Sequence, residues 1–94
     1  MDLITNEKLD RYFDLTERAF KKANASKNVS MLDKNVRDDF VDMIERYISD
    51  AKHFRKNNDF VNAFAAVSYA HGWLDAGARI GLFDVHDSEL FTVD

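Results

Sequence analysis

The chain has no cysteine, no proline and only three glycines among its 94 residues. Without cysteine it has no disulfide bonds, thiolate nucleophiles or sulfur-ligated metals. Without proline no helix has to be interrupted, so long helices are expected. The chain also lacks an apolar run near the roughly 20 residues of a membrane span, and it lacks a charged-then-apolar signal segment at its start. We therefore expect a cytoplasmic protein that does not bind membranes.

The composition is that of an ordinary globular domain. Apolar residues make up 46% and charged residues 32% of the chain, and the net charge is −4. The length predicts a single domain over residues 1–94. Lys and Arg are interleaved with acids along the whole chain. Because generic nucleic-acid binding needs a concentrated basic surface, we expect no nucleic-acid partner.

Apolar residues recur three and four positions apart in three segments, which predicts three helices. We expect them over about 6–24, 31–57 and 60–80, followed by a tail over 82–94. No strand pattern with a period of two is present. Helices joined by short links run up, down and up, so the prediction is an all-α, antiparallel three-helix bundle.

Residues suited to capping mark the expected helix ends. Thr5 or Asn6 can cap the first helix, and Asp59 can cap the third. Ser30, three residues before an acid, forms a loose capping box that starts the second helix at Met31. Gly81 is well placed to end the third helix in a left-handed conformation.

The third predicted helix carries more apolar surface than two neighbouring helices can cover. Its apolar residues span roughly 240° of the helical wheel, whereas a stripe near 150° suffices in such a bundle. We expect Leu82, Phe83 and Phe91 of the tail to cover part of the excess, and self-association or a protein partner to cover the rest. The simpler interpretation is that this helix is the central one and that Trp73 belongs to the core. The predicted interface residues are Tyr69, Trp73, Ala76, Ile80 and Phe83.

The run from Tyr69 to Gly77, continuing through Gly81 to Asp84, resembles domain of unknown function family 357. The segments around Tyr12 and Tyr47 resemble it too, so the likeness covers most of the chain. The resemblance implies a compact three-helix bundle and an archaeal cytoplasmic protein. The family carries no established activity, so the resemblance transfers no catalytic residue. The resemblance also implies members joined to nucleotidyl-transferase-like domains, and hence an accessory role.

His71 and Asp75 stand four residues apart and therefore share one helical face. Their spacing suits two metal ligands, or a carboxylate that orients an imidazole. Zinc would need a third ligand, for which only His53 or Glu45 is an obvious source. The simpler interpretation places His71 at the edge of the core, bonded to Asp75 or to a backbone carbonyl. We expect no metal and no cofactor.

Gly72 and Gly77 lie inside the third predicted helix, where each glycine costs about 1 kcal/mol relative to alanine. The cost indicates a close approach by other groups. Gly77 lies beside the apolar face, so a neighbouring helix is expected there. Gly72 lies on the polar strip, where a small ligand or a partner is the sharper hypothesis.

The sequence favours a small interaction or self-association module without catalysis. The alternative is a ligand-binding domain, or an accessory domain of a nucleotide-handling enzyme, that uses the polar strip of the third helix. No residue is predicted to be catalytic. The candidate ligand or partner residues are Ser68, His71, Gly72, Asp75 and Arg79.

Overall fold

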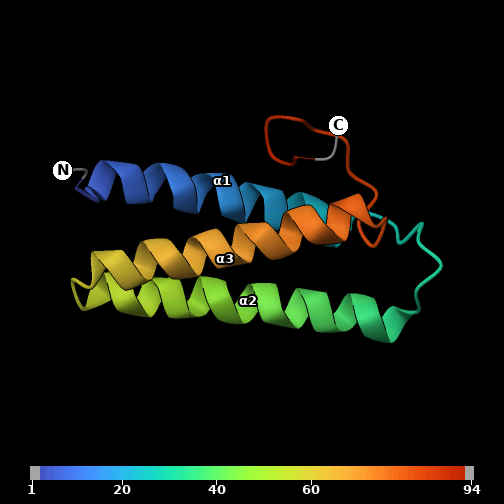
Figure 1. Ribbon diagram of the computed structural model, residues 1–94, viewed down its shortest axis with the longest axis horizontal. Coiled ribbons are helices and arrows are strands. Elements are labelled where there is room, and N and C mark those ends of the chain that lie inside the picture. The colour runs from blue at the N-terminus through green and yellow to red at the C-terminus, as the bar shows by residue number, and fades with distance from the viewer. Residues whose placement is uncertain (1–2, 93–94) are drawn as a thin grey trace.

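Three antiparallel helices make up most of the computed structural model, which describes residues 3–92. They are α1 (Asn6–Ala25), α2 (Lys34–Lys56) and α3 (Phe60–Arg79). Successive helices run in opposite directions, and α3 lies between the other two in the view of Figure 1. The prediction of an all-α three-helix bundle is confirmed. The last two residues of the predicted tail, and the first two of the chain, lie outside the described residues.

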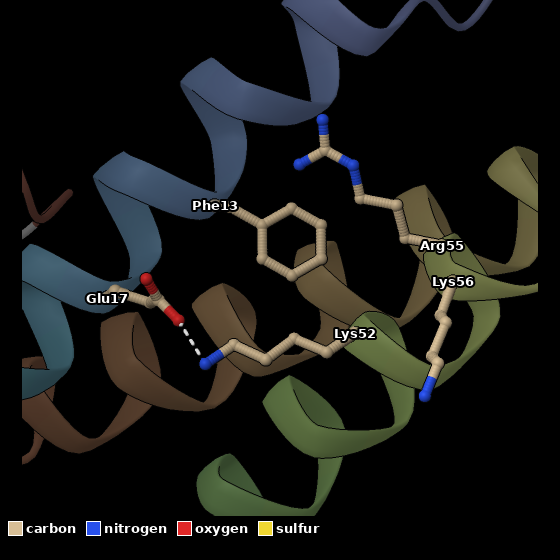
Figure 2. Close-up of a pocket in the computed structure, with 5 residues that line it drawn as sticks. All are labelled: Phe13, Glu17, Lys52, Arg55 and Lys56. Carbon is tan, nitrogen blue, oxygen red and sulfur yellow. Dashed lines mark ion pairs between the residues drawn. The ribbon is translucent and has the colours of Figure 1, made fainter.

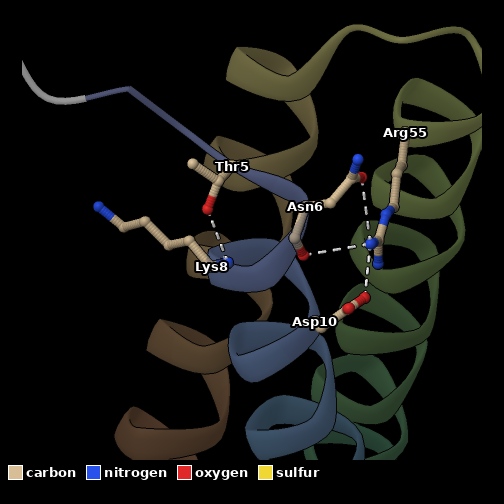
Figure 3. A network of polar contacts seen from close by, with 5 residues as sticks. All are labelled: Thr5, Asn6, Lys8, Asp10 and Arg55. Atoms are coloured by element: carbon tan, nitrogen blue, oxygen red, sulfur yellow. Dashed lines mark hydrogen bonds and ion pairs between the residues drawn. The ribbon is translucent and has the colours of Figure 1, made fainter.

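Two of the predicted caps close their helices as expected. The Thr5 hydroxyl accepts a hydrogen bond from the backbone N–H of Lys8 at 3.1 Å (Figure 3). Asp59 accepts one from the N–H of Asn62 at 3.2 Å. Each bond satisfies a donor that has no partner within its helix. Gly81 follows α3 with φ of +84°, a conformation that only glycine adopts readily.

The second helix begins three residues later than predicted, at Lys34 rather than Met31. Asp33 is its N-cap and accepts a hydrogen bond from the N–H of Val36 at 3.1 Å. Ser30 is instead held in a local turn, because the Asn28 side chain accepts hydrogen bonds from both its N–H and its hydroxyl. Asn and Ser side chains that bond to nearby backbone compete with helix formation, which explains the shift.

α3 is the central element of the packing. It packs most extensively against α2 and less against α1, whereas α1 and α2 barely touch. The buried positions of α3 are mostly alanines, with Val67 and Leu74 as the larger side chains. These small side chains let α1 and α2 approach the α3 backbone closely. The core therefore lies in two parts, on the two sides of α3.

Polar contacts join α1 and α2 at the end of the bundle where α1 begins and α2 ends. The Arg55 guanidinium donates to the Asn6 carbonyl at 3.3 Å and to the Asp10 carboxylate (Figure 3). The same guanidinium lies over the Phe13 ring, 5.5 Å from its centre and within the roughly 6 Å reach of a cation–π contact. These contacts fix the start of α1 against the end of α2.

The tail after α3 folds back onto the bundle. As far as Thr92 its apolar side chains are no more than 5% exposed, and they are Leu82, Phe83, Val85, Leu90 and Phe91. The Asp84 N–H donates to the Lys27 carbonyl at 2.9 Å, and Lys22 forms an ion pair with Asp87 at 3.0 Å. The tail therefore belongs to the core rather than trailing from it.

Arg37 of α2 joins the end of α1 to the start of the tail. Its guanidinium donates to the carbonyls of Ala23, Asn24 and Ser26, at 2.9 to 3.3 Å, and to the carbonyl of Leu82 at 2.5 Å. The last carbonyls of a helix have no partner within the helix. One forked cation satisfies several of them, which suits the planar geometry of arginine.

Candidate functional site

His71 and Asp75 hold the backbone of the folded tail. The His71 Nε2 lies 2.8 Å from the Leu90 carbonyl, and Nδ1 lies 3.1 Å from the Thr16 hydroxyl. Asp75 accepts a hydrogen bond from the Thr92 N–H at 3.0 Å. Two side chains one helical turn apart thus bind main-chain groups two residues apart in the tail.

These contacts fix the tautomer of a neutral His71. A carbonyl oxygen only accepts, so Nε2 carries the proton and donates it to Leu90. Nδ1 is then the acceptor for the fully buried Thr16 hydroxyl. Both ring nitrogens are therefore engaged in structural hydrogen bonds, as in the interpretation of His71 as an edge-of-core residue bonded to a carbonyl.

The remaining groups of the polar strip do not assemble around His71 as a metal site. Asp75 lies 3.9 Å from the His71 Nε2, while its carboxylate holds Thr92. His53, a candidate third ligand, lies instead within 3.2 Å of the Asn57 side chain. Across residues 3–92 no three His, Asp or Glu side chains gather in a way that could hold a metal ion.

The exposed side of α3 carries a mostly apolar surface that we call the α3 strip, with the exposed Arg79 at its C-terminal edge. Its residues recur at helical spacing and are Val61, Ala65, Ser68, Tyr69, Gly72, Trp73, Ala76 and Ile80. Val61 is 69%, Tyr69 61% and Ile80 47% exposed. Trp73 is partly buried, with its ring edge-to-face against Phe40 at 4.8 Å. The strip thus contains four of the five predicted interface residues.

Phe83, the fifth, lies elsewhere. It is 1% exposed and packs beside Gly77, with the Arg37 guanidinium 5.1 Å from its ring centre. The tail passes along the side of α3 that bears His71 and Asp75, and it leaves Tyr69 and Ile80 in solvent. Leu90 and Thr92 are bonded on the α1 side of the helix and Phe83 packs at Gly77, so the tail leaves the exposed part of the surplus apolar face uncovered.

The two glycines inside α3 have opposite surroundings. A Cβ added to Gly77 would lie 2.6 Å from Cδ2 of Phe83 and 3.4 Å from Cδ2 of Phe40. The close neighbours are therefore a tail ring as well as the expected helix. A Cβ added to Gly72 would meet no atom within 4 Å. Gly72 instead forms the floor of a shallow depression of about 320 Å³ beside Tyr69 and Trp73.

A second depression, of about 410 Å³, lies where α1 and α2 separate (Figure 2). Phe13 lies at its centre, and Lys52, Arg55 and Lys56 surround it. Lys52 forms an ion pair with Glu17 at 2.7 Å, and Arg55 forms one with Asp10. Since carboxylates pair with two of the three cations, the surface is not a concentrated basic site.

The sequence of the chain matches the family described as protein of unknown function (DUF357) over residues 11–83. The chain belongs to this family. The resemblance predicted from the run Tyr69 to Gly77 is thereby confirmed, and that run forms the centre of α3. No match was found among curated proteins or among solved structures.

The DUF357 match ends at Phe83, so the rest of the tail lies beyond it. The matched part contains His71, Asp75 and the α3 strip, but not Leu90 or Thr92, which His71 and Asp75 bind. In residues 3–92 no helix has the length and apolar content needed to cross a bilayer.

Proposed function

We propose that this protein is a small interaction module that acts by docking a protein partner on the α3 strip, without catalysis of its own. The observation that carries the proposal is the exposure of Tyr69, Val61 and Ile80 on one helix of the bundle. Contiguous apolar surface of this kind marks interaction sites in soluble proteins. Aromatic residues such as Tyr69 and Trp73 are also the common anchors of such sites.

Gly72 supports the same proposal. Glycine within a helix costs about 1 kcal/mol relative to alanine. No side chain of this chain uses the space above Gly72, since no atom lies within 4 Å of a Cβ built there. A partner that packs against the bare backbone would account for a glycine at this position, because close approach is what the missing side chain permits.

The ligand-binding alternative has less support. Its most reactive candidates, His71 and Asp75, are engaged by Thr16, Leu90 and Thr92. Arg79 is exposed at the end of α3 and makes no ion pair with another described residue. A docking surface needs none of these groups to be free.

A photo-crosslinking residue in place of Ser68 tests the proposal in the native host. We expect one discrete adduct, and we expect Gly72→Leu to abolish it because the leucine fills the depression. A crosslinker at Ser49, exposed on the side of α2 that faces α1, is the matched control and should give no such adduct. Absence of any Gly72-dependent adduct from position 68 would disprove the proposed function.

A further inference from the structure

We infer that the partner docked on the α3 strip is a second copy of this chain, related by a two-fold axis that crosses α3 between Ala70 and His71. The two α3 helices then run antiparallel. Because this names the partner of the surface described above, it rests on the proposed function. Two features support it, namely the self-complementary shape of the strip and the charges beside its two halves.

The shape of the strip matches itself about that axis. Tyr69, which protrudes and is 61% exposed, comes level with the empty floor at Gly72 of the second copy. Both such contacts form at once, because a two-fold interface repeats each contact. Ala65 and Ala76 come level with each other, which lets the helix backbones approach closely.

The ends of the strip are also matched. Val61 of one copy comes level with Ile80 of the other, and these are two of its most exposed apolar side chains. From Val61 to Ile80 the strip extends about 28 Å at 1.5 Å per residue. A seam of that length runs over nearly the whole of α3, and Arg79 comes level with the uncharged Asn62.

Charges beside the strip favour the antiparallel arrangement. At the N-terminal end of α3, the neighbouring helix α1 presents Lys8 and Arg11. Their position along α3 follows from Tyr12, whose ring centre lies 4.8 Å from that of Phe64. In the C-terminal half of α3, also beside α1, the tail presents Glu89, which is exposed and precedes the Leu90 held by His71, and Asp87, which is paired with Lys22. The two-fold axis exchanges the ends, so Lys8 and Arg11 of each copy come to the half of α3 that carries Asp87 and Glu89 of the tail in the other copy.

Cysteine pairing tests the orientation directly, because the natural chain contains no cysteine. We expect Ala65→Cys chains mixed with Ala76→Cys chains to form a disulfide-linked dimer on mild oxidation. Each variant alone should link poorly, since the single cysteines of the two copies would then lie far apart, on opposite sides of the axis. Preferential linking of each variant to itself would show a parallel pair and overturn the antiparallel arrangement.

Sedimentation equilibrium tests the dimer itself. We expect the natural chain to be a dimer at high concentration, and Gly72→Leu to weaken association by about tenfold or more, as expected for the centre of an interface. Ser49→Leu, at an exposed position on the side of α2 that faces α1, is the matched control and should leave association unchanged. The circular dichroism of Gly72→Leu should remain helical, because nothing lies within 4 Å of the new Cβ.

Charge reversal supplies an independent readout. Arg11→Glu should weaken the dimer, and Glu89→Lys should restore it when the two changes are combined. On the α2 side, the ring contacts of Phe40 with Trp73 and of Tyr47 with Tyr69 set the register of α2 along α3. In this register the arrangement brings Asp39 level with Asp50 of the second copy, so Asp50→Lys should tighten association. A parallel pair would instead bring Asp50 nearer Arg11, and the same change would weaken it.

The two levels of the proposal fail in different ways. A chain that stays monomeric at every concentration disproves the second copy as the partner. If position 68 still gives a Gly72-dependent adduct whose mass is not that of two chains, the interaction module stands with a different partner. If it gives no adduct, both proposals fail.

Discussion

Gly72 and Gly77 lie on the same helix, five residues apart, yet one is open to solvent and the other is covered. At Gly77 the missing side chain is replaced by the Phe83 ring, so the chain itself uses the space that glycine leaves. At Gly72 the same absence has no internal use. The comparison shows two uses of a helical glycine: at Gly77 it makes room for a ring of the same chain, and at Gly72 it leaves a bare surface on which the proposed partner would pack.

The largest loss of stability should come from removing the Phe83 ring, which covers Gly77. Phe83→Ala removes a fully buried ring and is expected to destabilise the fold by about 3–5 kcal/mol. Gly77→Ala alone should cost about 1–3 kcal/mol, because its Cβ would collide with the ring. In the Phe83→Ala background the Gly77 change should become neutral or stabilising, and chemical denaturation of all four proteins measures this coupling. Additive costs would contradict the packing described for Gly77.

Arg37 supports the same covered side, because its guanidinium lies over Phe83 and bonds to four carbonyls. Hydrogen bonds that involve a charged group contribute about 1.5–3 kcal/mol, so Arg37→Met should destabilise the protein by about that amount. Arg37→Lys should recover only part of the loss, since an ammonium lacks the planar fork. Urea denaturation compares the three proteins, and full recovery by lysine would show that charge alone matters.

At Gly72, on the open side of the helix, an added methyl group should stabilise the monomer and not destabilise it. Gly72→Ala should stabilise the monomer by about 0.5–1 kcal/mol, because alanine is the better helix former and meets no atom there. Thermal unfolding of dilute protein measures the gain. Destabilisation would mean that something in the folded chain does occupy the space, and the contrast between the two glycines would be lost.

The smallest effect concerns the tail that covers the Gly77 side. The Lys22 ammonium bonded to Asp87, with help from the Glu89 N–H, lowers the pKa of Asp87 from its ordinary value of 3.8. A carboxyl whose pKa is lowered by folding stabilises the folded state above its unfolded pKa, and that stabilisation is lost as pH falls through the folded value. We therefore expect tail docking to weaken below pH 3.8. Asp87→Asn should remove this pH dependence, as monitored by amide exchange of Leu90 and Phe91.

Much of the fold could be predicted from periodicity alone. Leu9, Phe13 and Thr16 of α1, and Ile44 and Ile48 of α2, recur at helical spacing and are buried as that spacing requires. The start of α2 could not be predicted in the same way. Ser30 and Asp33 are both acceptable caps, and the choice depends on the Asn28 side chain that holds Ser30 in a turn.

The candidate site was less predictable than the helices. The positions of Tyr69 and Ile80 on the surplus apolar side followed from the helical wheel, and so did the shared face of His71 and Asp75. The path of the tail did not, because its acids and apolar residues follow no regular period. Arg37 was missed as well, since its partners are backbone carbonyls, which leave no mark in the sequence.

Arg37 also couples the local opening of three segments of the chain. It binds carbonyls at the end of α1, in the linker and at the start of the tail, so it has its full set of partners only when all three segments are in place. Local opening of one of these segments therefore also weakens the hydrogen bonds of the Arg37 guanidinium to the other two. We expect the last turn of α1 and the tail to exchange their amide hydrogens together, as one cooperative unit, and not to fray independently as exposed chain ends do.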